Sequence, residues 1–191
     1  MFPLTSDEKR FLLDLARQSL TAAVWKQLPD RPAELPPALH ESALGVFVSL
    51  HQRGATEEPL RGCVGFLEPR RPLWVAVCEA AASAAWKDPR FPPVRPEELP
   101  LLEVEISVLS ASWPIDPGSI QIGLHGLIVT AGRIRGLLLP QVAAEHHWSA
   151  EQFLEQTCCK AGLRSDAWRH GAQIEAFTAE VFGEISLLGE R

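Results

Sequence analysis

The sequence contains no tyrosine and no asparagine, and only four of its 18 basic residues are lysines. Without tyrosine there is no phenolic general acid, and without asparagine there is neither a Cys-His-Asn triad nor a site for Asn-linked glycosylation. Phosphate-binding loops, dinucleotide-binding fingerprints, G-x-S-x-G elbows and H-E-x-x-H helices are absent as well. These absences exclude the enzyme classes that the missing residues and motifs define.

Long hydrophobic runs are also absent. The longest apolar segment, residues 73–86, includes Glu79 and is too short to span a bilayer. Because the charged residues at positions 7–10 follow no apolar stretch, we expect no signal peptide, no membrane association and a cytoplasmic location. The formal net charge of −6 argues against a broad basic surface, so we expect no general binding to duplex nucleic acid.

Cysteine is scarce, with residues only at positions 63, 78, 158 and 159. They form no C-x-x-C pair and none has a histidine at zinc-finger spacing, so the sequence indicates no metal site and specifies no cofactor. Cys78 lies in an apolar segment, where burial should raise its pKa. At least one of Cys158 and Cys159 should also be buried.

The rest of the composition is typical of a globular protein. With 191 residues, 46% of them hydrophobic, the chain is long enough for one domain over residues 1–191, or one body in two lobes. The patterns predict helices over residues 5–28, 73–86, 140–147 and 149–161, and strands over residues 44–51, 60–67, 102–110, 127–131, 134–139 and 174–182. A proline-rich loop occupies residues 29–43. Hairpins with helices between them predict an α+β fold with a mostly antiparallel sheet and packed helices.

Local signals mark the ends of two of these helices. Thr5 stands three residues before Glu8, and Ser149 stands three residues before Gln152, which is the spacing of a capping box. Gly162 is the expected C-terminal stop of the last helix.

The most specific chemical signal is a cysteine between two glycines, in the segment RGCVG at residues 61–65. Glycines on a strand leave the backbone open, so a ligand could approach the sulfur of Cys63. Arg61 and Cys63 share a strand face, and a guanidinium there should lower the pKa of the thiol and make Cys63 the most reactive of the four thiols. The alternative is a buried apolar cysteine whose flanking glycines let a helix pack closely.

Two other groups of charged residues could carry chemistry. Asp88 and Arg90 lie in a proline-fixed loop and could form an anion-binding guanidinium held by its carboxylate, or an ion pair that locks the loop with Phe91 as its anchor. Glu103 and Glu105 lie about 7 Å apart on one strand face, close enough for paired acid and base work, although such a face is more often solvated.

Several segments resemble the AMMECR domain family. Residues 60–65 (LRGCVG) are similar to its signature hexapeptide, and the similarity continues through residues 87–91, 106–109, 123–126, 139–142, 145, 148 and 160–163. These segments fall in order over most of the chain from residue 44 onward. The resemblance is closest to the prokaryotic branch called AmmeMemoRadiSam system protein A. Cys158 and Cys159 lie outside the family's pattern, so we interpret both as core residues.

The resemblance implies an α+β fold in two lobes and names no reaction. It also implies a functional Cys63 with four residues near it, Arg61, Asp88, Arg90 and Lys160. Lys160 lies in the last turn of its expected helix, where a cation also offsets the helix dipole. The family name implies two partners, a Memo-type protein and a radical SAM protein.

We therefore carry an enzyme hypothesis and two alternatives. In the first, the protein is an enzyme or enzyme subunit in which Cys63 acts as nucleophile or thiolate ligand, Arg61 and Arg90 hold a small anionic ligand, and Asp88 orients Arg90. The alternatives are a non-catalytic nucleotide- or RNA-binding module, which would use the arginines at positions 61, 70, 71, 90 and 95, and a protein-interaction module that serves the partners.

Overall fold

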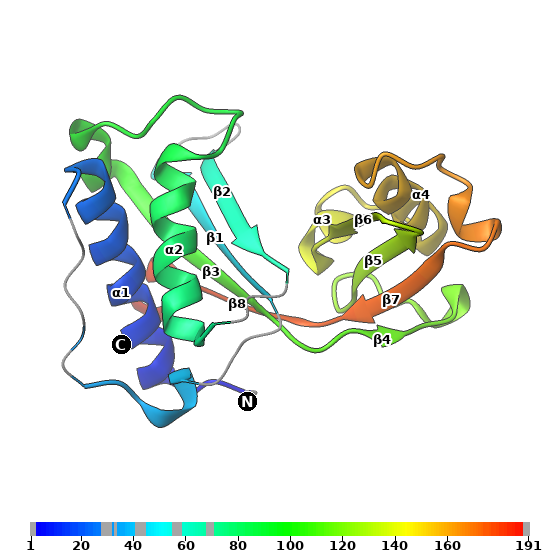
Figure 1. Ribbon diagram of the computed structural model, residues 1–191, viewed down its shortest axis with the longest axis horizontal. Coiled ribbons are helices and arrows are strands. Elements are labelled where there is room, and N and C mark those ends of the chain that lie inside the picture. Colours follow the sequence, from blue (N-terminus) through cyan, green and yellow to red (C-terminus); the bar gives the residue numbers. More distant parts are fainter. Residues whose placement is uncertain are drawn as a thin grey trace. The chain divides into compact units, whose positions relative to one another are not determined.

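The computed structural model describes residues 3–27, 32, 34–40, 45–54, 59–67 and 71–188. The chain divides into two units: unit 1 comprises residues 1–108 and 180–191, and unit 2 comprises residues 109–179 (Figure 1). Unit 2 is therefore inserted between two segments of unit 1. Leu28, Leu44, Arg70, and parts of the proline-rich loop and of the turn after residue 52 lie outside the described residues.

Unit 1 is built on a four-stranded sheet in the order β2-β1-β3-β8. Its strands are β1 (Gly45–Gln52), β2 (Leu60–Phe66), β3 (Leu102–Leu109) and β8 (Ala179–Gly183). The hairpin predicted from the sequence is confirmed, because β1 and β2 pair antiparallel with Ser49 opposite Cys63. Alternate residues of β1 (Val46, Val48 and Leu50) are fully buried, so this side of the sheet faces the core.

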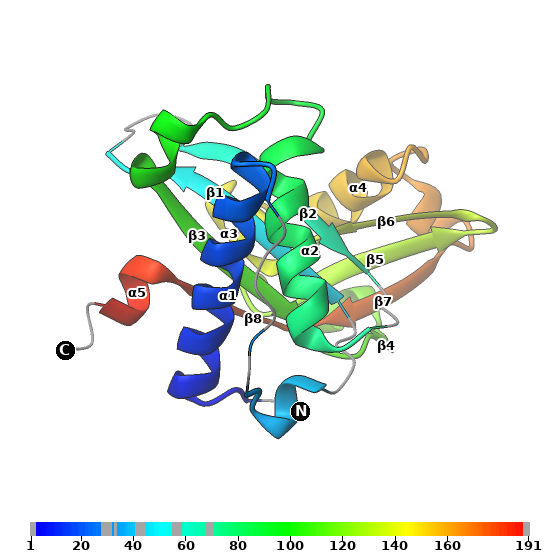
Figure 2. The same cartoon turned by 60° about the vertical axis from the view of Figure 1, so that its left-hand side comes forward.

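Two helices cover that face of the sheet. α1 (Ser6–Val24) and α2 (Leu73–Trp86) lie side by side, and α2 packs on β1 and β2 (Figures 1 and 2). The capping box of α1 is confirmed, since Glu8 donates its backbone N–H to Thr5 Oγ1 and accepts the Thr5 N–H. A short helix, α5 (Glu184–Leu188), follows β8 and was not predicted.

Unit 2 has its own sheet and its own core. The order is β4-β7-β5-β6, formed by β4 (Trp113–Pro114), β5 (Gly126–Ala131), β6 (Ile134–Leu138) and β7 (Gln173–Phe177). Two helices, α3 (Pro140–Glu145) and α4 (Ala150–Lys160), complete it, and α4 packs on β5 and β6. The core of unit 2 contains Leu127, Phe153 and Leu154, all almost fully buried. Ser149 and Gln152 form the predicted capping box, and Gly162 follows α4 with a φ of 77°.

Short 3₁₀ helices connect these elements. They span Pro37–His40, Pro96–Leu101, Pro117–Ser119 and Ala167–Arg169. The second of them matters for the candidate site because it carries Glu98.

The α+β class is confirmed, but one strand prediction is wrong. Residues 174–182 were expected as one strand and form two, β7 and β8, which belong to different sheets. The apolar alternation continues through this segment, and alternation reports which face of a strand is buried, not which sheet the strand joins. β4 also falls where a loop was expected.

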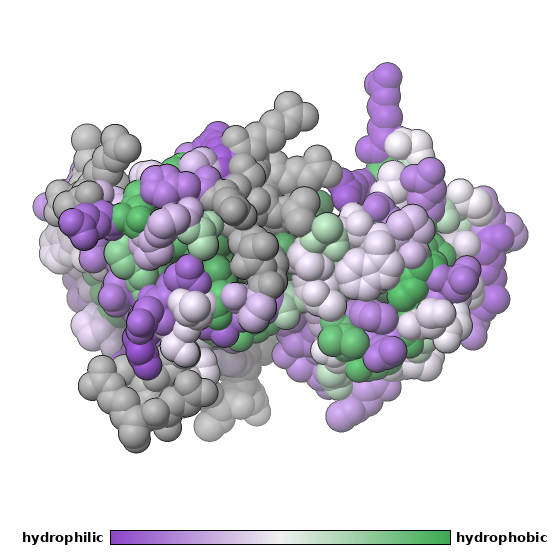
Figure 3. Space-filling view, turned by 90° about the horizontal axis from the view of Figure 1, so that it is seen from below, coloured by the Kyte–Doolittle hydropathy of each residue, from purple (hydrophilic) through white to green (hydrophobic). Residues whose placement is uncertain are grey.

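Two observations concern hydrophobic segments and surfaces. No helix among the described residues is long and apolar enough to cross a membrane. On the face of unit 2 that is visible in Figure 3, small hydrophobic patches are separated by near-neutral and hydrophilic residues. That face therefore presents no broad apolar surface.

Candidate functional site

The candidate site is built around Cys63 on the edge strand β2. Its neighbour Gly62 faces Ala84 of α2, so the thiol of Cys63 projects from the opposite side of the strand, where it is half-buried. Ser49 Oγ donates a hydrogen bond to Cys63 Sγ at 3.2 Å. The backbone N–H of Cys63 donates to Asp88 Oδ2 at 2.8 Å. Asp88 thus accepts a hydrogen bond from a backbone N–H on the open edge of the sheet.

Asp88 also fixes the loop that follows α2. The residue is only 5% exposed, and its carboxylate accepts from Arg90 Nε at 3.0 Å, from Arg90 Nη2 at 2.7 Å and from the Arg90 backbone N–H at 3.1 Å. The Arg90 guanidinium is the main cause that lowers the pKa of Asp88 from 3.8 to about 2. The Arg90 side chain remains 54% exposed and lies over the Phe91 ring at 5.3 Å. The ion pair therefore locks the loop and still presents a cation.

Arg61 pairs with Glu98, whereas we expected its guanidinium to act on the thiol of Cys63. Arg61 Nε and Nη2 donate to the two carboxylate oxygens of Glu98, at 2.7 and 3.1 Å. Its guanidinium carbon lies 6.0 Å from the centre of the Phe91 ring, which Arg90 also approaches. Arg61 is thus near the cluster but committed to Glu98, a partner that no local motif reveals.

The expected lowering of the Cys63 pKa is wrong. Burial raises the pKa of the Cys63 thiol, and the hydrogen bond from Ser49 and the charge of Arg90 offset part of that rise. The carboxylates of Asp88 and Glu105 raise the pKa further. At neutral pH the sulfur is therefore mainly protonated.

The glycines beside Cys63 serve packing. A Cβ at Gly62 would clash with the backbone oxygen of Ala84, and a Cβ at Gly65 would clash with the Phe47 ring and the backbone of β1. The interpretation that these glycines open the backbone to a ligand is wrong, and close packing of a helix is confirmed for Gly62. Access to the thiol must come from the face of the strand.

Strands β1 and β3 contribute further ionisable side chains near Cys63 or on the same sheet. His51 Nε2 lies 3.7 Å from Glu105 Oε1, and Glu105 is close enough to raise the pKa of Cys63. Glu103 accepts the backbone N–H of Ile185 at 3.2 Å. Both glutamates are half-buried, so the expected solvated face is instead a partly covered, bonded one.

The predicted site residues divide between the two units. The structure brings Cys63, Asp88 and Arg90 together in unit 1, with Arg61 beside them through Phe91. Lys160 is the last residue of α4 in unit 2 and is exposed. Its convergence with the other four residues stays a prediction.

The remaining cysteines correct the expected order of reactivity. Burial raises the pKa of both Cys78 and Cys158, as expected for core residues. Cys158 is buried, but Cys159 is exposed, so its interpretation as a core residue is wrong. Any thiol reagent will therefore meet Cys159 as well as Cys63.

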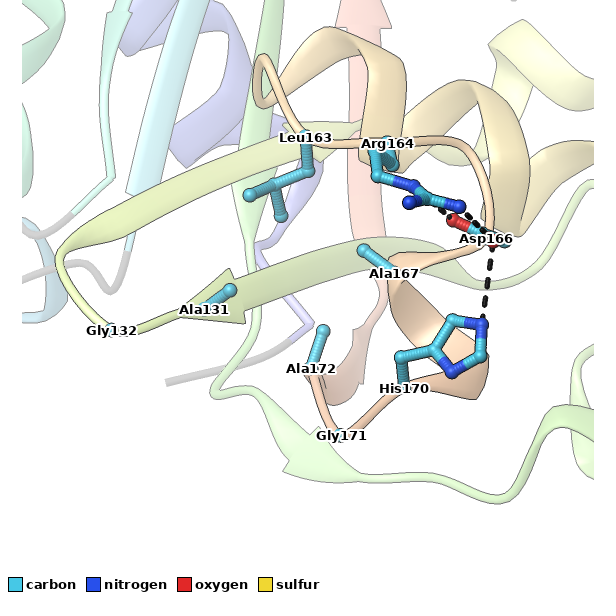
Figure 4. A pocket seen from close by; sticks show the side chains of 9 residues that line it. All are labelled: Ala131, Gly132, Leu163, Arg164, Asp166, Ala167, His170, Gly171 and Ala172. Atoms are coloured by element: carbon cyan, nitrogen blue, oxygen red, sulfur yellow. Dashed lines mark hydrogen bonds and ion pairs between the residues drawn. The ribbon is translucent and has the colours of Figure 1, made fainter.

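Unit 2 contains a pocket of about 580 Å³ that the sequence patterns did not indicate (Figure 4). None of the predicted site residues lines it. Its polar members, Arg164, Asp166 and His170, lie within seven positions of each other, a local spacing that could have marked them as a cluster. Among the described residues, no group of three or more His, Cys, Asp or Glu side chains could hold a metal ion.

Two antiparallel sheets, each with its own helices, place the protein in the α+β class. Residues 13–182 match the AMMECR1 family, and the chain belongs to this family. A protein of Thermofilum pendens is 42% identical over 203 residues, which cover 98% of this chain and 94% of that protein. A protein of Methanothermobacter thermautotrophicus is 45% identical over 194 residues, with coverages of 95% and 97%.

The fold is also similar to a solved structure. The crystal structure of an uncharacterized protein from Pyrococcus horikoshii superposes with a TM-score of 0.88 at 40% sequence identity, and the match covers 95% of this chain and 93% of that chain. The resemblance to the AMMECR domain family is thereby confirmed.

Proposed function

We propose that the protein is an enzyme or enzyme subunit that binds a small anionic ligand in unit 1 and uses Cys63 as its reactive group. One observation carries the proposal. The buried carboxylate of Asp88 bonds both the backbone of Cys63 and the guanidinium of Arg90, and so holds a half-exposed cation beside a half-buried thiol.

Arg90 is the residue that would contact the anion. Nε and Nη2 of Arg90 donate to Asp88, and Nη1 of Arg90 has no hydrogen-bond partner among the described residues. The carboxylate also fixes the plane of the guanidinium, so little freedom is lost when a second anion binds. Arg61 is bonded to Glu98 and would add positive charge near the site without direct contact.

The protonation state of Cys63 sets a condition on the chemistry. Because the pKa of the thiol is raised, a nucleophilic role requires that the proton leave the sulfur as the new bond forms. Ser49 and Arg90 stabilise the negative charge that develops on the sulfur, and Glu105, whose carboxylate is near enough to act on the pKa of Cys63, would accept the proton. The proposal therefore assigns Cys63 a base-assisted role.

The partners rest on the family resemblance alone. The proposal includes a Memo-type protein and a radical SAM protein that act with this chain in the cytoplasm. Co-purification of either protein with the tagged chain at physiological salt would support this part, and recovery of the chain without either would contradict it.

The site itself is tested by comparing an anionic and a neutral thiol reagent. Iodoacetate and iodoacetamide are applied separately to the native protein, and labelling of Cys63 and Cys159 is measured by peptide mass spectrometry. Cys159 is exposed and serves as the internal reference. We expect the ratio of iodoacetate to iodoacetamide labelling to be higher at Cys63, by about fivefold, because one nearby charge contributes about 1 kcal/mol.

Substitutions then assign the preference to its residue. Arg90→Met should remove the preference for iodoacetate and Arg90→Lys should keep part of it, whereas Arg95→Met, at a side chain that is 78% exposed in the same loop, should change nothing. Equal ratios of iodoacetate to iodoacetamide labelling at Cys63 and Cys159 would contradict an anion site beside Cys63. A Cys63 that reacts only after unfolding, or a Cys63→Ser variant that is strongly destabilised, would make the thiol a packing residue and favour a non-catalytic binding or interaction module.

A further inference from the structure

The pocket of unit 2 has apolar walls and a polar rim. It is formed by the turn between β5 and β6 and by the loop between α4 and β7, and its volume is about 580 Å³. Figure 4 shows the side chain of Leu163 and the methyl groups of Ala131, Ala167 and Ala172 turned toward the hollow. These small side chains leave the space open.

The rim is a cluster of three side chains centred on Asp166. Arg164 Nε and Nη2 donate to its two carboxylate oxygens at 3.1 and 2.9 Å, and His170 Nε2 lies 3.3 Å from Asp166 Oδ2 (Figure 4). Arg164 and His170 are largely exposed, with side-chain exposures of 83% and 69%. Ion pairs this exposed and this local in sequence add little stability, so fold stability does not explain the cluster.

The free donors of the cluster determine what the pocket can hold. Both carboxylate oxygens of Asp166 already accept from Arg164, whereas Nη1 of Arg164 has no partner among the described residues. An incoming cation at Asp166 would lie beside the positive charge of Arg164, whereas an incoming anion can accept from the unused Nη1 edge of the guanidinium. Since Asp166 holds that guanidinium in one orientation, the donor is preorganised.

We propose that this pocket binds a small apolar molecule that carries one carboxylate. Its apolar part would contact Leu163 and the three alanines, and its carboxylate would accept from Nη1 of Arg164. The site lies entirely within unit 2 and does not depend on the function proposed for Cys63.

Three probes that share one ring and differ in charge test the proposal. Benzoate, benzamidine and benzyl alcohol are titrated into the full chain, and dissociation constants are measured by NMR chemical-shift perturbation of the backbone amides. We expect benzoate to bind with saturable shifts at Gly132, Arg164 and Ala172, and to bind at least about fivefold more tightly than benzamidine or benzyl alcohol.

Variants separate the charge from the cavity. Arg164→Met should weaken benzoate binding at least about fivefold. Arg133→Met, at an exposed arginine of the β5–β6 turn that is not among the lining residues, should leave it unchanged. Ala172→Leu should fill the hollow and remove binding of benzoate. Cys63→Ser should have no effect.

Four outcomes would overturn the proposal: benzoate shifts that do not saturate, shifts located outside the pocket, benzamidine binding as tight as that of benzoate, or full affinity in the Arg164→Met variant. Each variant is first compared with the parent chain by its NMR spectrum, so that loss of the fold is recognised. If Ala172→Leu unfolds unit 2, the Arg164→Met and Arg133→Met pair still decides the question.

Discussion

At the scale of single residues, Asp88 links strand β2 to the loop that follows α2. It is buried, it accepts the backbone N–H of an edge strand, and it holds Arg90 through both carboxylate oxygens. A buried carboxylate is stable only when its charge is compensated, and here a cation and two backbone donors do so. The protein's response to acid should therefore depend on this residue.

We predict that Asp88 contributes about 2 kcal/mol to the free energy of unfolding and that this contribution depends on pH. Its pKa is lowered from 3.8 to about 2 in the folded protein, so the unfolded chain binds the proton first. The stabilisation is complete above about pH 5 and is lost as the pH falls through about 2. Urea unfolding of the Asp88→Asn variant and the parent chain at several pH values measures this.

The expected pattern is a stability difference that is large at pH 6 and small near pH 2. Asp116→Asn, at an exposed aspartate of unit 2, serves as the control and should leave the pH dependence unchanged. A difference between the Asp88→Asn variant and the parent chain that stays constant from pH 6 to pH 2 would show that the carboxylate acts through its shape and not through its charge.

At the scale of elements, the sequence predicted most helices and strands and failed where a partner lies far along the chain. The ends of α2 and the capping boxes at Thr5 and Ser149 follow from local signals, and the structure confirms them. The bond between Arg61 and Glu98 joins residues 37 positions apart, so nothing in the strand pattern of β2 indicates it. The raised pKa of Cys63 has the same origin, because burial depends on the whole unit.

A network around Arg17 also joins residues that are far apart in the sequence, and it connects three elements of unit 1. Arg17 Nε donates to Glu184 Oε1 at 2.8 Å, and its Nη2 donates to the backbone oxygen of Leu102 at 2.8 Å. Glu184 in turn accepts the backbone N–H of Val104 at 2.9 Å. The pair thus ties α1 and the start of α5 to strand β3.

We predict that Arg17→Met destabilises unit 1 by about 2 kcal/mol. The substitution leaves the carboxylate of Glu184, whose side chain is only 16% exposed, without its bidentate guanidinium partner. Arg10→Met, on the same helix but with a partly exposed side chain paired to an exposed aspartate, should cost less than about 0.5 kcal/mol. Thermal and urea unfolding measure both variants, and equal effects would show that the Arg17 network adds nothing beyond a surface ion pair.

At the scale of the whole molecule, the chain leaves unit 1 after β3, completes unit 2 and returns as β8. The two ends of the inserted segment are tied together, since Ser110 donates its backbone N–H to the Thr178 oxygen at 2.9 Å and its hydroxyl oxygen accepts the Thr178 N–H at 2.9 Å. Neighbouring ends and a separate core are properties of a segment that can fold by itself. No sequence pattern predicted this arrangement, because residues 174–182 look like one continuous strand.

We predict that unit 2, expressed as residues 109–179, folds without the rest of the chain. Its core is formed by its own residues, among them Leu127, Phe153 and Leu154, and domains of about 55–65 residues are known to fold alone. A dispersed NMR spectrum and a cooperative thermal transition are expected, and Phe153→Ala should abolish the transition, because such a truncation costs about 3–5 kcal/mol. Lys160→Ala, at an exposed position, should leave the transition in place. An isolated unit 2 with a collapsed spectrum and no transition would show that its sheet needs unit 1 to form.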